Sequence, residues 1–158
     1  MTKKYPVTPA VRFLRSHSID FEPLLYDYEE HGGTAQSAAC LGLDEHSVIK
    51  TIILADEHKH GLIVLMHGDK QISTRNLARQ LNRKHIEAAA PAQANRWTGY
   101  LVGGTSPFGC KSPLPVYVER SILNLPLIYI NGGKRGFLVS LPPAALASLN
   151  AQPVDVAV

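Results

Sequence analysis

The sequence predicts an α+β fold with a curved mixed β-sheet and helices packed around it. Runs rich in β-branched and aromatic residues outnumber the helical patterns, and several follow one another across short turns. Helix and strand signals do not alternate strictly along the chain, which favours a partly antiparallel sheet over a doubly wound parallel one. At 158 residues the chain is long enough to bury a core without disulfides, and we expect residues 1–158 to form a single domain.

Capping residues and turns define the elements of the first half. Thr8 followed by Pro9 is typical of a helix start, and Gly42 is typical of a helix end. A polar turn over 56–61 separates two apolar runs, which predicts an antiparallel hairpin. The expected elements are a helix from Thr8 to His17, a strand over 21–28, a helix from Thr34 to Gly42, and strands over 48–55 and 62–66.

The second half contains more strands than helices. Ser73 and Thr74 are candidate N-caps, and the Pro142-Pro143 pair favours the start of a last helix. The expected elements are a helix capped by Ser73 or Thr74, a strand over 86–89, a helix over 91–96, strands over 116–119, 127–130 and 137–141, and a helix from Pro142 to Asn150. The helix after Ser73 is expected to contain Leu77, Ala78 and Leu81, with Arg79, Arg83 and Lys84 near its end.

The composition is that of an ordinary globular protein, with 45% hydrophobic and 18% charged residues. The net charge of +3 is compatible with a polyanionic partner but does not require one. No apolar run reaches the length of a membrane span, and the N-terminus lacks the apolar stretch of a signal peptide. We therefore expect a cytoplasmic protein without a membrane partner, in which Cys40 and Cys110 are free thiols.

A glycine-rich segment over 98–111 is the main functional candidate. Its glycines permit positive φ angles and allow a ligand to approach the backbone closely. Such a loop can direct several N–H groups at one anion or carbonyl oxygen. A plain surface connection is the alternative interpretation. Lys50 and a second glycine cluster over 132–136 favour the functional interpretation.

Lys50 is a single cation inside the apolar run 48–54. On a strand its side chain shares a face with Val48, Ile52 and Leu54, which places an ammonium group on an otherwise apolar side. A lysine at a sheet edge that points to solvent is the alternative. A cation that lines a cleft and binds a phosphate or a carboxyl ester also explains the placement.

The other motifs carry weaker signals. The cluster 132–136 lacks the spacing of a Walker motif, so a simple glycine hairpin is an alternative to a binding loop. His58 and His60 lie in a turn without a nearby cysteine, and we expect no metal and no cofactor. Cys110 lies next to Lys111 but has no histidine in its loop, so we expect neither cysteine to be catalytic.

Three segments together resemble the YbaK/EbsC family of aminoacyl-tRNA deacylases: Ile49–Thr51, Thr98–Pro107 and Tyr129–Gly136. The resemblance spans nearly the whole chain, and the family is also similar to the editing domain inserted in some prolyl-tRNA synthetases. It implies a curved, partly barrel-like sheet and the hydrolytic removal, in trans, of a wrong amino acid from tRNA. Cys-tRNA(Pro) is the first expected substrate and Ala-tRNA(Pro) the second. The attacking group would be water or the thiol of a cysteinyl substrate.

The resemblance also implies roles for particular residues. Lys50 would bind the terminal adenosine or its phosphate. The residues expected to hold the ester carbonyl, mainly through backbone amides, are Gly103, Gly104, Thr105, Ser106 and Pro107. The residues expected to bind substrate are Tyr26, Asn131, Gly132, Gly133 and Lys134. Cysteine deacylases commonly have serine at the position of Asn131 and a polar or acidic residue at the position of Leu138, so the reaction class is better supported than the amino acid.

A second class of function also fits the sequence, namely a non-catalytic module that binds tRNA. A basic face would serve either function, and its members would be Arg75, Arg79, Arg83, Lys84 and Arg96. The expected partners are the 3′ acceptor end of an aminoacyl-tRNA and, in a ternary complex, a prolyl-tRNA synthetase. A phosphate-loop enzyme that acts on a nucleotide is disfavoured because neither glycine cluster has the required spacing.

Overall fold

The computed structural model describes residues 4–158. In this part of the chain eight strands form one sheet in the order β1-β7-β6-β2-β3-β5-β8, with β4 paired to β2 outside this path. The strands are β1 (Glu22–Leu25), β2 (Val48–Asp56), β3 (Gly61–His67), β4 (Ile86–Ala88), β5 (Val116–Glu119), β6 (Ile128–Lys134), β7 (Phe137–Leu141) and β8 (Gln152–Val154).

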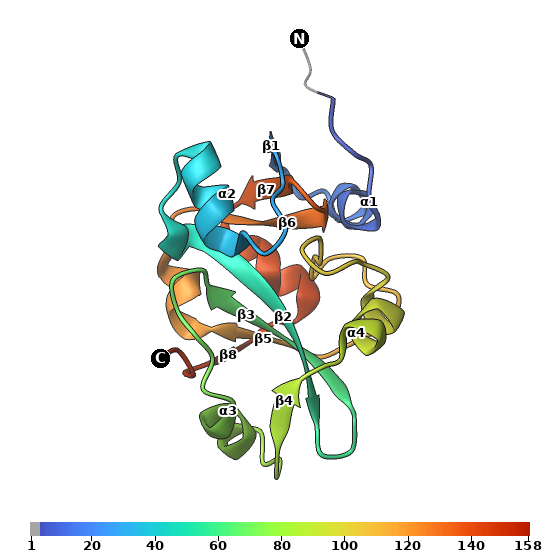
Figure 1. Ribbon diagram of the computed structural model, residues 1–158, viewed down its shortest axis with the longest axis vertical. Coiled ribbons are helices and arrows are strands. Elements are labelled where there is room, and N and C mark those ends of the chain that lie inside the picture. The colour runs from blue at the N-terminus through green and yellow to red at the C-terminus, as the bar shows by residue number, and fades with distance from the viewer. Residues whose placement is uncertain (1–3) are drawn as a thin grey trace.

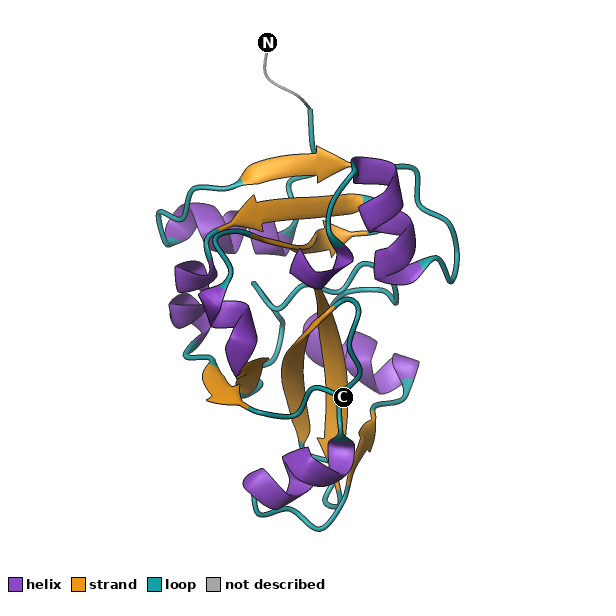
Figure 2. Cartoon of the chain, turned by 90° about the vertical axis from the view of Figure 1, so that its left-hand side faces the viewer, coloured by secondary structure: helices purple, strands orange, loops and turns teal. Residues whose placement is uncertain are grey.

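The sheet is mixed and strongly twisted. Strand β2 pairs antiparallel with β3 and β4 and parallel with β6, and the pairs β3–β5 and β5–β8 are also parallel. In Figure 1, β6 and β7 cross the upper part of the molecule, whereas β2 and β3 run diagonally below them. Figure 2 shows the upper strands running across the view and the lower strands running along its vertical axis. The predicted α+β fold with a curved mixed sheet is confirmed.

Four α-helices and three 3₁₀ helices surround the sheet in the described residues. The α-helices are α1 (Pro9–Ser16), α2 (Gly33–Leu41), α3 (Thr74–Gln80) and α4 (Pro91–Thr98), and the 3₁₀ helices are η1 (Glu45–Ser47), η2 (Arg120–Asn124) and η3 (Pro143–Leu149). Thr8 caps α1 as predicted, because its hydroxyl accepts a hydrogen bond of 3.1 Å from the amide of Val11. None of the helices described is long and apolar enough to cross a bilayer.

Some element boundaries differ from the prediction. The last helix, η3, is of the 3₁₀ type and is followed by the C-cap residue Asn150, which adopts a left-handed conformation. Strand β1 is shorter than the predicted 21–28, and β8 was not predicted. The second glycine cluster lies in the antiparallel hairpin of β6 and β7: Gly132 and Gly133 form a bulge in β6, and Arg135 and Gly136 form the turn.

Alternation along β2 explains the position of Lys50. Ile49 and Ile53 point into the main core, which α1 covers, whereas Val48 and Leu54 belong to two smaller clusters on the opposite face. Helix α2 packs over the cluster at Val48, and α3 over the cluster at Leu54. Lys50 therefore lies on an apolar face, as predicted, in the gap between two helices. Strand β2 is inside the sheet and not an edge strand, although residues 50–53 lack a strand partner on one side among the described strands.

Candidate functional site

The main cavity has a volume of about 530 Å³ and lies beside the middle of β2. One wall is formed by Tyr26, Tyr28 and the start of α2, and the opposite wall by Ala89 and the start of α4. Residues 48–53 of β2 form the floor. The glycine-rich loop and the end of β6 close one side through Gly103, Thr105 and Asn131. The structure thus brings together Lys50, the glycine-rich loop and part of the second cluster, which are far apart in the sequence.

Lys50 is half-buried at this floor, and its Nζ donates to the backbone carbonyl of Lys70. Burial lowers the pKa of the Lys50 ammonium, and the negative charges of Glu45 and Asp69 oppose this shift. The ammonium therefore donates to one carbonyl and feels the charge of two acidic neighbours. An ammonium with free donors beside a cavity is suited to bind a phosphate or a ribose oxygen.

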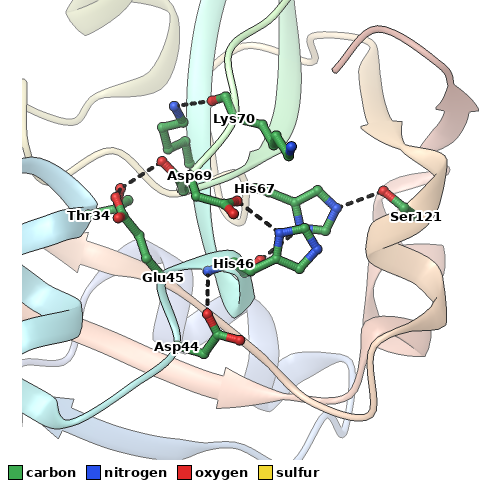
Figure 3. Close-up of polar contacts among 10 residues, drawn as sticks. Thr34, Asp44, Glu45, His46, His67, Asp69, Lys70 and Ser121 are labelled. Atoms are coloured by element: carbon green, nitrogen blue, oxygen red, sulfur yellow. Dashed lines mark hydrogen bonds and ion pairs between the residues drawn. The ribbon is translucent and has the colours of Figure 1, made fainter. Parts of the chain in front are cut away.

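A polar cluster, shown in Figure 3, supports the loop that contains Lys70. The Thr34 hydroxyl contacts Glu45 Oε2 at 2.8 Å and the carbonyl of Gly68 at 3.2 Å, which joins α2 to η1 and to the end of β3. His46 Nδ1 lies 2.8 Å from Asp69 Oδ1. These contacts fix the loop after β3 and, through it, the carbonyl that holds Lys50.

His67 adds a second layer to this cluster (Figure 3). Its Nδ1 donates to the carbonyl of His46 at 2.7 Å, so its Nε2 is the acceptor for the Ser121 hydroxyl at 2.7 Å. The rings of His46 and His67 stack with 3.7 Å between their centroids. His46, His67 and Asp69 are close enough to hold a metal ion. However, both His67 nitrogens are occupied and the two rings are parallel, so this set does not converge on one ion.

Gly103 closes the cavity on the loop side with a φ of +86°. A Cβ atom at this position would collide with the hydroxyl of Tyr28, so glycine is required by both conformation and space. Thr105, two residues further, also faces the cavity. This part of the loop is the part that a substrate can reach.

The two glycine clusters touch each other. The side-chain amide of Asn131 donates to the carbonyl of Gly103 at 3.2 Å, and its oxygen accepts from the amides of Gly133 and Lys134 at 2.7 Å and 3.2 Å. Arg135 Nε donates to the carbonyl of Val102 at 2.7 Å. Asn131 therefore joins the bulge of β6 to the glycine-rich loop, a link that the single hydroxyl of a serine could not make in full.

Several predicted site residues do not line the cavity. Pro107 and Ser106 are buried, and the Ser106 hydroxyl accepts from the amide of Phe108. The amide of Gly104 donates to Leu101 at 2.9 Å, so this N–H is not free for a substrate. Lys134, Gly132 and Gly133 also lie outside the lining. Gly132 contacts the ring of Phe137, and Gly133 lies against Tyr100, so both support the loop from behind.

Tyr28 and Arg135 line the cavity although the sequence prediction did not select them. The Arg135 guanidinium lies 5.3 Å from the centre of the Tyr28 ring, in a cation–π arrangement. The only sequence signal for Arg135 was its place beside Lys134 in the second glycine cluster. Together with Lys50, Arg135 gives the cavity two basic side chains.

The cysteines do not contribute a nucleophile to the cavity. Burial raises the pKa of the Cys110 thiol to about 11, so the thiol is protonated at neutral pH. Cys110 lies outside the cavity lining, and its Sγ contacts the carbonyl of Ser106 at 3.4 Å. Cys40 is exposed on α2 and does not line the cavity.

The chain matches a known family over most of its length. Residues 29–149 match the aminoacyl-tRNA editing domain, and the chain belongs to this family. Over 143 residues it is 27% identical to EbsC of Enterococcus faecalis, provisionally named a Cys-tRNA(Pro)/Cys-tRNA(Cys) deacylase, and the alignment covers 90% of this chain and 87% of EbsC. The family resemblance inferred from the three sequence segments is confirmed.

The chain is also similar to part of a prolyl-tRNA synthetase and to a solved structure. Over 86 residues the chain is 30% identical to the proline–tRNA ligase of Brachyspira hyodysenteriae. This alignment covers 54% of this chain and 15% of the ligase. A crystal structure described provisionally as a trans-editing enzyme for prolyl-tRNA synthetase matches with a TM-score of 0.83 and 21% identity, covering 99% of both chains. The structural match confirms the fold.

Proposed function

We propose that this protein is an aminoacyl-tRNA deacylase that acts in trans on mischarged tRNA. Cys-tRNA(Pro) is the first candidate substrate and Ala-tRNA(Pro) the second. The main supporting observation is that Lys50 and residues of both glycine clusters line one cavity. The family match of the chain to the aminoacyl-tRNA editing domain adds to it. A prolyl-tRNA synthetase is proposed as a partner that presents the tRNA.

The proposed chemistry needs no side-chain nucleophile. The substrate is an ester between an amino acid and the ribose of the terminal adenosine, which is already activated toward cleavage. Water, or the thiol of a cysteinyl substrate, forms a bond to the ester carbon while the carbon–oxygen bond to the ribose breaks. The proton that the water or the thiol loses is transferred to the ribose oxygen, which regenerates the free 3′ end of the tRNA.

The contribution of the protein is position and charge. Gly103 and Thr105 line the cavity and are proposed to hold the ester carbonyl, with the Asn131 link fixing the loop. Lys50 is proposed to bind the ribose or the phosphate of the terminal nucleotide. A second, editing site is useful because a synthetase pocket distinguishes side chains by only about 1–3 kcal/mol per methylene.

A panel of charged tRNAs tests this proposal. Cys-tRNA(Pro), Ala-tRNA(Pro), Pro-tRNA(Pro) and Cys-tRNA(Cys) are incubated with the protein, and the loss of labelled amino acid is followed over time. We expect turnover of one or both mischarged species and little turnover of Pro-tRNA(Pro). Binding without turnover of any species would contradict the proposal and would favour the non-catalytic tRNA-binding module.

A further inference from the structure

Strand β2 has a gap in its pairing along the edge that faces the cavity. On this edge β6 pairs with Val48 and Ile49, and β4 pairs with residues 54–56. Between them, residues 50–53 have no strand partner on this side within the described chain. Lys50, Thr51 and Ile52 are partly exposed, whereas the two residues on either side are buried. At about 3.3 Å per residue the open edge is about 10 Å long.

The backbone groups that point to this edge can be identified from the pairing. The carbonyl of Ile53 accepts from the amide of Ala89 at 3.0 Å, on the cavity side. Its partner across the hairpin, Ile63, donates to Pro115 and thus away from β2. The polar groups of Ile53 therefore point away from β3, and by alternation so do those of Thr51.

Three backbone groups and one side-chain group of this edge lack partners in the described chain. Within residues 4–158 the structure shows no hydrogen bond for the N–H and C=O of Thr51 or for the N–H of Ile53. The Thr51 hydroxyl is also buried without a partner. Unpaired buried polar groups are costly, and their presence beside a cavity points to a ligand that completes them.

The carbonyl of Thr51 and the N–H of Ile53 form an acceptor next to a donor. A ligand that pairs with both needs a donor next to an acceptor, as in the Watson–Crick edge of adenine, where the N6 amino group lies beside N1. Ala89, Pro91 and Ala94 line this end of the cavity with small apolar surfaces that suit a flat ring. A protonated α-amine fits less well, because an ammonium group has donors only and would leave the N–H of Ile53 without an acceptor.

We propose that the open edge of β2 recognises the adenine of the 3′-terminal nucleotide, with the N6 amino group donating to the carbonyl of Thr51 and N1 accepting from the amide of Ile53. This proposal rests on the proposed function of the cavity. The adenine end lies toward β4 and α4. The ester end then extends along β2 toward Asn131, which follows the last β6 residue paired with β2, and toward Gly103.

Binding of short RNA acceptor ends tests the proposal without requiring turnover. Oligonucleotides that end in adenosine, purine riboside or inosine are compared by fluorescence anisotropy. Purine riboside lacks the N6 donor, so we expect a loss of about tenfold. Inosine reverses donor and acceptor at this edge, and we expect a loss of at least about a hundredfold. Equal affinity for the three ends would overturn the proposal.

Two substitutions locate the base. Ala89→Leu fills the wall beside the edge and should abolish the preference for adenosine, whereas Ala88→Leu changes the neighbouring, exposed residue of β4 outside the cavity and should retain it. Thermal melting confirms that both variants fold. Unchanged adenosine preference in folded Ala89→Leu would also contradict the proposal. Deacylation is measured separately to distinguish this proposal from the proposed function. Turnover without a preference for adenosine would contradict adenine recognition alone. A preference for adenosine without turnover would contradict the deacylase function alone.

Discussion

Gly103 combines two constraints at one residue. Its φ is positive, and a Cβ atom would meet the Tyr28 hydroxyl. Gly42 has a similar positive φ at the end of α2 but open space around the Cβ position. The two glycines therefore separate backbone strain from the effect of a side chain at the cavity.

Alanine substitutions at these positions give the first prediction. Both Gly103→Ala and Gly42→Ala should destabilise the fold by about 1–2 kcal/mol, because an L-residue is strained at positive φ. Only Gly103→Ala should lose most of its deacylation, since it displaces Tyr28 or the loop. Denaturant unfolding and turnover are measured for both. Comparable activity in the two variants would mean that Gly103 has no special place in the site.

Cys110 provides the second prediction. Its thiol is protonated at neutral pH because burial raises its pKa to about 11. We expect Cys110→Ser to retain deacylation within a few-fold. A loss of a hundredfold or more in a folded variant would identify Cys110 as a nucleophile and would contradict a mechanism based on backbone groups.

At the scale of elements, a carboxylate fixes the hairpin of β2 and β3. Asp56 is buried and accepts from the amides of His58 and His60, both at 2.9 Å, and from Arg83. Burial alone would raise the pKa of Asp56, but the hydrogen bonds from His60, His58 and Arg83 outweigh it and lower the pKa. Arg83 is thus committed to the hairpin and is not a free member of the expected basic face.

Acid unfolding gives the third prediction. Because the folded pKa of Asp56 is depressed, its stabilising effect is complete above the unfolded value near about 4 and is lost as the pH falls through the folded value. Asp56→Asn should cost about 1–3 kcal/mol at pH 7 and should flatten the fall in unfolding free energy below about pH 4. The check is urea unfolding across pH 2.5 to 7, roughly the range of carboxyl titration. An unchanged acid slope would refute this role.

The sequence predicted the elements with local signals more successfully than those that depend on distant contacts. Thr8 and Gly42 marked helix ends because capping is a local interaction. Strand β8 was missed because it depends on pairing with β5 and on Glu119, whose carboxylate accepts from the amides of Val156 and Ala157. Such an interaction leaves no periodic pattern in the sequence.

The candidate site shows the same division. Lys50 was found because a cation on an apolar face is unusual at the level of residue pattern. Tyr28 and Arg135 were not selected, because their role depends on the contact between loops that lie far apart in the chain. Whether the selected residues act on a substrate stays a prediction.

At the scale of the whole molecule, charge sets the expected mode of tRNA binding. The net charge is +3, and α3 and α4, which contain Arg75, Arg79 and Arg96, lie on either side of β4 (Figure 1). The residues of the expected basic face therefore come from separate elements. This arrangement favours a small number of phosphate contacts over an extended interface.

Salt dependence of tRNA binding is the fourth prediction. With about three to five phosphate contacts on a single-stranded acceptor end, the logarithm of the affinity should fall against the logarithm of salt with a slope of about −2 to −3.5. Titration of tRNA at several salt concentrations measures the slope. A flat response would exclude nucleic acid as the partner.

The most direct test of the account is the deacylation rate of Lys50→Ala on the best mischarged tRNA, with Lys70→Ala as the control. The side chain of Lys70 is exposed and only its carbonyl contacts Lys50, so the control removes a nearby cation and leaves the contact in place. We predict that folded Lys50→Ala loses at least about a hundredfold in turnover, as expected for a group that stabilises charge or position in a site, whereas Lys70→Ala stays within a few-fold. Full turnover by folded Lys50→Ala would contradict the assignment of this cavity as the deacylation site.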